Sequence, residues 1–132
     1  YKGKTDFSFE ASLAFKGLKA SDYDALLVPG GFAPDKIRTE QAALDLVRAF
    51  KEAGKPIAMI CHAGWVAASA GIAKGVKLTS TKAIKDDLVH AGADWVDKEV
   101  VVDLRMVTSR GPDDMPAFMR AFIKEIEKDS KK

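Results

Sequence analysis

The chain has 132 residues, of which 47% are hydrophobic and 30% charged, a composition that suits one globular domain with its own core. Its 21 basic and 19 acidic side chains nearly balance, and no basic stripe alternates with aromatic residues, so we expect no nucleic-acid binding. A single cysteine excludes an internal disulfide and fits a reducing cytoplasm, and no apolar run reaches the roughly 20 residues of a membrane span. We therefore expect one cytoplasmic domain over residues 1–132.

Short apolar runs alternate with helical patterns along the chain. The polar stretch 1–12 is expected to be an edge strand or an extended lead-in, and residues 32–35 a loop. The other expected elements are, in order, a strand over 23–28, a helix over 39–53, a strand over 57–60, a helix from about 65, a strand over 76–80, a helix over 84–91, a hairpin of 95–102 with 106–109, and a last helix from 115. This alternation predicts an α/β fold with a mostly parallel sheet covered by helices on both faces.

Several patterns further along the chain have structural interpretations. The last helix carries apolar residues at helical spacing, which predicts a stripe facing the core: Met115, Phe118, Met119, Phe122, Ile123 and Ile126. Asp86 and Asp87 are expected on a solvated helix surface, and His90 on the surface because no cysteine or carboxylate stands at metal-ligand spacing from it. Arg110 follows a strand and either reaches a functional site or pairs with an acid.

The stretch 55–70 is the most informative, because a buried strand runs through one cysteine straight into a helix. No residues remain for a loop, so Cys61 must occupy a tight strand-to-helix turn. The free N–H groups and positive dipole end of the following helix favour a thiolate over a thiol. A sharp turn also lifts the side chain out of the sheet, as in the serine elbow of α/β-hydrolases. This context favours a nucleophile over a small buried hydrophobic residue.

His62 and the pair Gly30-Gly31 are each open to two interpretations from the residues alone. His62 is either a general base for Cys61 or a polar capping residue. The two glycines after a strand either serve a turn or let the backbone approach a ligand. Ligands of parallel sheets bind beyond the carboxyl ends of strands, where both segments should lie as neighbours. The N–H groups of Gly31 and His62 would then converge on one oxygen near the sulfur.

Four segments together carry a family resemblance. YDALLVPGGFAPDKIR (23–38), GKPIAMICHAG (54–64), IKDDLVHAGADWVDKEVVVD (84–103) and VTSRGPDDMPAFMRAFIKEI (107–126) resemble the ThiJ/PfpI family in sequence and in order, most closely its intracellular protease I branch. The resemblance covers nearly the whole chain. It implies a class I glutamine amidotransferase-like fold, which is a flavodoxin-like three-layer sandwich.

The resemblance also implies the roles of the site residues. Cys61 would be the nucleophile, His62 its partner, and the backbone N–H groups of Gly31 and His62 the oxyanion hole. In the protease branch, an acid that follows the two glycines and comes from a neighbouring subunit orients the histidine. Asp35 stands at that position here, where a typical member has the longer Glu. The implied assembly is a dimer building up to a hexamer, with active sites at subunit contacts.

This chain differs from the family pattern in one respect. Family members begin with a strand, a helix and a second strand before the segment that matches Tyr1, and one of these strands is central and accompanied by a carboxylate that hydrogen-bonds to the cysteine. We therefore expect the domain to be incomplete at its N-terminus. We also expect a gap in the middle of the sheet, with exposed apolar faces and unpaired strand edges.

Two classes of function follow. The first is a cysteine enzyme without cofactor or metal, acting on a carbonyl or acyl carbon. It would convert methylglyoxal or its adducts to lactate, as a glyoxalase or deglycase does, or cleave peptides as an intracellular protease. The second is a non-catalytic stress protein, a redox sensor or chaperone, in which Cys61 is oxidised. A flavodoxin-like carrier or receiver shares the architecture, but no residues support it.

Overall fold

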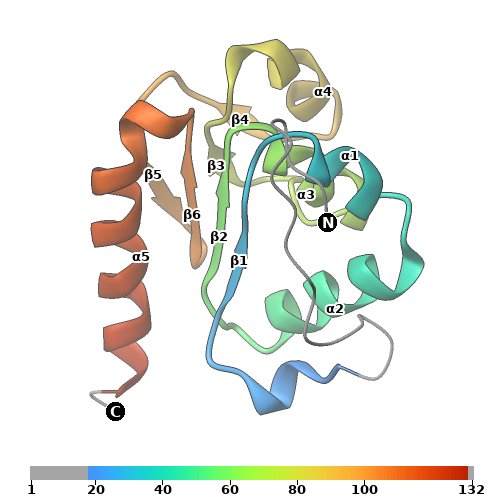
Figure 1. Cartoon of the computed structure of the whole chain (residues 1–132), viewed down its shortest axis with the longest axis vertical. Coiled ribbons are helices and arrows are strands. Elements are labelled where there is room, and N and C mark those ends of the chain that lie inside the picture. Colours follow the sequence, from blue (N-terminus) through green and yellow to red (C-terminus); the bar gives the residue numbers. More distant parts are fainter. Residues whose placement is uncertain (1–17, 131–132) are drawn as a thin grey trace.

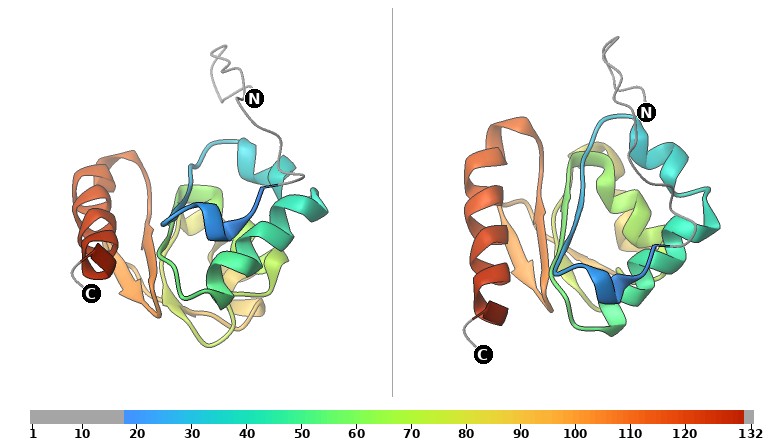
Figure 2. Two further views of the ribbon diagram at one scale, coloured as in Figure 1. Left: turned by 90° about the horizontal axis from the view of Figure 1, so that it is seen from below. Right: turned by 60° about the horizontal axis from the view of Figure 1, so that its bottom comes forward.

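A computed structural model describes residues 18–130 and shows three layers (Figures 1 and 2). The middle layer is a four-stranded sheet in the order β1-β2-β6-β5. Helix α5 covers one face, and helices α1, α2 and α3 cover the other. The strands of the sheet are β1 (Leu26–Val28), β2 (Ile57–Ile60), β5 (Val101–Asp103) and β6 (Met106–Ser109), and the helices are α1 (Ala33–Ile37), α2 (Gln41–Glu52), α3 (Gly64–Ala70), α4 (Lys85–His90) and α5 (Met115–Ser130). The three-layer α/β fold predicted from the sequence is confirmed.

The strands pair as an α/β sheet requires. β1, β2 and β6 are parallel, and only β5 runs antiparallel, in a hairpin with β6. β3 (Lys77–Leu78) and β4 (Asp94–Trp95) form a separate two-stranded parallel sheet. Short 3₁₀ turns, η1 (Ala20–Asp22), η2 (Cys61–Ala63), η3 (Lys82–Ile84) and η4 (Pro112–Asp114), join these elements.

The central strand β2 explains how one sheet holds two cores. All four of its residues are buried, and their side chains alternate between the faces. Ile57 and Met59 belong to the core shared with α2 and α3, whereas Ala58 and Ile60 belong to the core under α5. A continuous apolar run is therefore the right pattern for this strand, because helices cover it on both sides.

Three expectations about individual elements are wrong. Residues 32–35 were expected in a loop, but all of them except Phe32 lie in the short helix α1, which has Pro34 in its first turn where a proline is tolerated. The expected strand 95–102 is split between β4 and β5, which belong to different sheets. The stripe of α5 is only partly buried: Phe118 and Phe122 lie in the core, while Met115 and Ile123 are exposed. The expected lead-in strand 1–12 lies outside the described residues.

The expected gap in the middle of the sheet is also wrong. Across residues 18–130 the four strands are contiguous, and β1 lies at an edge. Leu27 of β1 is 40% exposed. A groove of about 250 Å³ with an almost wholly apolar lining runs between β1, α1 and α2.

An ion pair between a half-exposed arginine and a buried aspartate fixes the connection from β6 to α5. The backbone N–H and the guanidinium of Arg110 donate to the carboxylate of Asp114, with Nε at 2.8 Å from Oδ2, and Nη1 donates to Asp97 at 2.9 Å. Asp114 is 6% exposed and stands in the turn that opens α5, where an acid also suits the helix dipole. Of the two interpretations of Arg110, the structure supports pairing with acids. The hydrogen bonds from Arg110 hold the pKa of Asp114 below its usual value of 3.8.

This pair predicts a pH-dependent stability difference. A carboxyl group whose pKa is lowered by folding stabilises the protein above its unfolded pKa, and that contribution is lost as the pH falls through the folded pKa. Asp114→Asn should therefore be less stable than the parent protein near pH 7, and the difference should shrink as the pH falls below about 4. Urea unfolding at several pH values measures it. Asp113→Asn, at the exposed neighbour, is the control, and an equal loss in both variants would contradict the prediction.

Candidate active site

Cys61 stands where β2 ends and the 3₁₀ turn η2 begins. Its φ is +61°, in the left-handed region that residues other than glycine rarely adopt. The preceding Ile60 is extended, so the chain changes direction at Cys61 itself. The N–H of Thr81 donates to the Cys61 carbonyl at 3.3 Å and helps to hold the turn. A strained residue between a strand and a helix is the arrangement of a nucleophile elbow, and such strain is common at functional sites.

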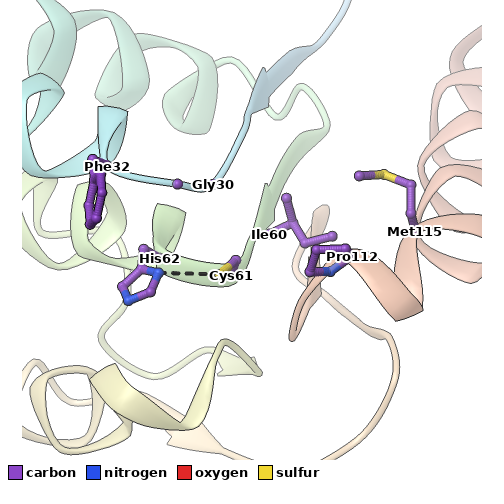
Figure 3. A pocket seen from close by; sticks show the side chains of 8 residues that line it. Gly30, Phe32, Ile60, Cys61, His62, Pro112 and Met115 are labelled. Carbon is purple, nitrogen blue, oxygen red and sulfur yellow. Dashed lines mark hydrogen bonds between the residues drawn. The ribbon is translucent and has the colours of Figure 1, made fainter. Parts of the chain in front are cut away.

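The neighbouring histidine contacts the sulfur directly. Cys61 Sγ lies 3.2 Å from His62 Nδ1, as the dashed line in Figure 3 shows. Adjacent residues of a regular helix point in different directions, but the turn at Cys61 brings these two side chains together. Both side chains are half-buried, so they are in reach of a substrate. A thiol in this contact can pass its proton to the imidazole, which is the geometry that activates a cysteine nucleophile.

Gly30, the first of the two glycines after β1, lies against the cysteine, so the two segments are neighbours as the sequence predicts. A Cβ on Gly30 would stand 2.8 Å from the Cβ of Cys61 and 3.6 Å from its Sγ, so only glycine allows this approach. Gly31 follows with φ +79°, and no backbone or side-chain acceptor among residues 18–130 takes its N–H. That N–H is therefore free to bind an oxygen of a ligand, whereas its role in an oxyanion hole stays a prediction.

A pocket of about 300 Å³ opens over the sulfur. Figure 3 shows Phe32 and His62 on one side of Cys61, with Pro112 and Met115 on the other. Eight residues line it: Gly30, Gly31, Phe32, Ile60, Cys61, His62, Pro112 and Met115. The sequence reasoning missed the wall formed by Pro112 and Met115. The available signal was the Gly111-Pro112 pair after β6, whose carboxyl end lies at the same edge of the sheet as those of β1 and β2.

The structure does not bring the other predicted residues to the sulfur. Asp35 is exposed on α1, and no carboxylate among residues 18–130 hydrogen-bonds to His62. His90 and Asp86 are exposed on α4. In the part of the chain that the structure describes, no group of three or more histidine, cysteine or acidic residues is arranged to hold a metal ion.

Comparison with known proteins identifies the family of this chain. Residues 1–125 match the DJ-1/PfpI family. The chain belongs to the DJ-1/PfpI family.

Two relatives show how far the family likeness extends. The chain is 43% identical over 125 residues to the deglycase PfpI of Pyrococcus furiosus, a match that covers 95% of this chain and 75% of that protein. It is 41% identical over 128 residues to general stress protein 18 of Bacillus subtilis, covering 96% of this chain and 73% of the relative. The resemblance inferred from the four sequence segments is confirmed, and enzymes stand among its relatives.

A solved structure shows the DJ-1/PfpI fold of this chain in a larger protein. A two-domain protein of Anabaena variabilis contains a DJ-1/ThiJ/PfpI-like and a ferritin-like domain. It superposes with a TM-score of 0.93 at 36% identity, over 96% of this chain and 37% of that one.

In the described part of this chain, no helix is both long and apolar enough to cross a membrane.

The contact between Gly30 and the elbow can be tested in this DJ-1/PfpI protein without knowing its substrate. Gly30→Ala places a methyl group against Cys61, so we expect the alkylation of Cys61 by iodoacetamide to slow by about tenfold or more, since small displacements at a reactive group have large effects. Mass spectrometry of the alkylated protein gives the rate.

Gly111→Ala is the matched control for this substitution. Gly111 has an extended backbone, and a Cβ there meets no atom within 4 Å, so its alkylation rate should equal that of the parent protein. Equal rates for Gly30→Ala and the parent protein would show that the close approach does not shape the site.

Proposed function

We propose that this chain is a cysteine enzyme without an added cofactor that converts small α-oxoaldehydes such as methylglyoxal, or their adducts on amines, to α-hydroxy acids. The observation that carries the proposal is the 3.2 Å contact between Cys61 Sγ and His62 Nδ1 at the floor of the pocket. The name of the Pyrococcus furiosus relative, a deglycase, supports the same chemistry.

The first step uses the groups at the elbow. The thiolate of Cys61 forms a bond to the aldehyde carbon, and the electron pair of the C=O bond moves to the oxygen. The N–H groups of Gly31 and His62 stabilise that oxygen, and His62 delivers the proton it took from the thiol. The product is a hemithioacetal.

The remaining steps balance within the substrate. His62 carries the proton from the former aldehyde carbon to the neighbouring carbon, and the proton of the hemithioacetal hydroxyl moves to the ketone oxygen. The first carbon thus becomes a thioester carbonyl, and the ketone becomes an alcohol. Water then cleaves the thioester, which releases the hydroxy acid and restores the thiol. One substrate carbon is oxidised and its neighbour is reduced, so the reaction needs no external oxidant or reductant.

The pocket favours a small carbonyl substrate over a peptide. Its volume of about 300 Å³ is at the low end for ligand sites, and its walls are mostly apolar side chains. A peptide attacked by the same thiolate would form an acyl-enzyme, which is the protease alternative. An extended peptide would need to pass between Phe32 and Met115, which lie on opposite sides of Cys61.

The test is the production of lactate from methylglyoxal by the purified protein without glutathione. We expect turnover that Cys61→Ala reduces to background and that His62→Ala lowers by about 10²- to 10⁴-fold, the usual contribution of a general acid-base group. His90→Ala, at the other histidine, is the matched control and should keep full activity because His90 is exposed on α4.

Two results would contradict the proposal. One is lactate formation that survives Cys61→Ala, and the other is faster turnover of a fluorogenic peptide than of methylglyoxal. The name of general stress protein 18 favours the second candidate, a stress protein that works through oxidation of Cys61. In that case protection of cells from oxidants would survive His62→Ala. For either role we propose the cytoplasm, where a lone cysteine stays reduced.

We further propose that the chain forms a homo-oligomer, from dimer to hexamer, in which Asp35 of one subunit orients His62 of another. The exposure of Asp35, with Phe32 60% exposed near it at the pocket, supports a subunit contact at this surface. The absence of a carboxylate partner of His62 within residues 18–130 leaves that position open.

Complementation between inactive variants tests this assembly. Cys61→Ala and Asp35→Asn should each have low activity, and their mixture after subunit exchange should regain part of it, because some contacts then combine an intact Cys61 with an intact Asp35. The activity of the mixture against the sum of its parts is the measurement. A mixture no more active than that sum, or an active monomer by light scattering, would exclude the shared site.

A further inference from the structure

His62 has a second neighbour besides the sulfur. Its ring centroid lies 5.0 Å from that of Trp65, with the two rings tilted by 52°. Residues three apart share a face of a helical turn, so the passage from η2 into α3 brings Trp65 beside His62. Aromatic rings at this separation and tilt attract each other. The indole is thus in position to limit the rotation of the imidazole.

Trp65 is itself held by groups from other elements. Its Nε1–H donates to Oδ2 of Asp87 on α4 at 2.8 Å. The guanidinium of Arg38, at the end of α1, lies 5.5 Å from the centre of the Trp65 ring, within the range of a cation–π contact. Arg38 is fixed in turn, because its Nε donates to Oγ of Ser69 at 2.9 Å. An indole held at its edge and over its ring is a firm support for its neighbour.

A histidine that serves as a base needs a group to orient it. The torsion that turns an imidazole is broad, so packing or a hydrogen bond must select the position in which Nδ1 faces the sulfur. In the usual arrangement a third polar group fixes the base. Among residues 18–130 no carboxylate does so for His62, and the ring contact that the structure shows is to Trp65.

We propose that Trp65 is a positioning residue of His62 within its own subunit, and that Asp87 acts through it by fixing the indole. The inference rests on the proposed role of His62 as the proton carrier for Cys61. It assigns a function to Asp87, which was expected from the sequence only to lie on a solvated helix surface.

The kinetic test compares substitutions that keep or remove the ring. Trp65→Leu should lower kcat for methylglyoxal by about 10- to 100-fold with little change in KM, as expected when a reacting group is displaced without loss of binding. Trp65→Phe keeps an aromatic ring and should recover most of the loss. Asp87→Ala should lower kcat less than Trp65→Leu does. The matched control is Asp86→Ala, at the adjacent exposed carboxylate, which should behave as the parent protein.

A spectroscopic test needs no substrate. The chain has two tryptophans, so Trp95→Phe leaves Trp65 as the only indole. An imidazolium in contact with an indole quenches its fluorescence, so the emission should fall as His62 becomes protonated. This fall in Trp65 emission with decreasing pH should vanish when His62→Ala is added. That control separates the effect of His62 from any effect of Asp87 or His90. A pH-dependent fall in emission that persists without His62, or an emission that does not change with pH, would overturn the proposed contact.

A third readout separates this inference from the proposed function. If methylglyoxal is not a substrate, the pH profile of Cys61 alkylation by iodoacetamide still reports the contact between sulfur and imidazole. Trp65→Leu should shift that profile toward the one of His62→Ala, and Trp65→Phe should restore it. An unchanged profile in Trp65→Leu, in a protein that keeps its circular dichroism spectrum, would reduce Trp65 to a packing residue.

Discussion

The site depends on one backbone constraint, the left-handed conformation of Cys61 between β2 and η2. With an ordinary extended or helical φ, the sulfur would stay among the side chains of the sheet or turn. The unusual φ directs the sulfur to the pocket and His62 to the sulfur. A residue in this region costs about 1–3 kcal/mol, which the surrounding packing must offset. The fully buried β2 and the hydrogen bond from Thr81 provide that support.

The sheet supplies the rest of the pocket through its topology. β1, β2 and β6 run parallel as neighbours, so the segments that follow them leave from the same edge. These segments carry, in turn, the two glycines, the cysteine with its histidine, and the loop to α5 with Pro112. Residues far apart in the sequence thus meet at the pocket without long loops, because each lies directly after a strand or in the turn and helix that follow it. The ion pair of Arg110 with Asp114 secures the last of these segments, although neither side chain lines the pocket.

Local patterns predicted the parts of the site that depend on local geometry. A buried strand that runs into a helix leaves a cysteine only one kind of place, so Cys61 and the nearby glycines could be located from sequence. The wall formed by Pro112 and Met115 depends on strand order, which periodicity does not reveal. The same holds for residues 95–102, whose apolar pattern suits one strand but whose two ends pair with different partners. The contact between Trp65 and His62 could not be predicted either, because the sequence indicates that Trp65 lies in a helix but not which side chain its ring meets.

Two different kinds of neighbour can support His62: an aromatic ring that limits its rotation, and a carboxylate that interacts with its charge. An indole fixes the plane of the imidazole without adding a charge beside it, so the ring is free to take and return a proton during each turnover. A carboxylate at the same place would favour the imidazolium and hold that proton. If Asp35 of a neighbouring subunit supplies such a charge, it adds a second, charged contact to an imidazole that Trp65 already supports from within its own subunit. The contact with Trp65 lies within residues 18–130, whereas a contact with Asp35 would need a second subunit, so substitutions at the two residues separate the two kinds of support.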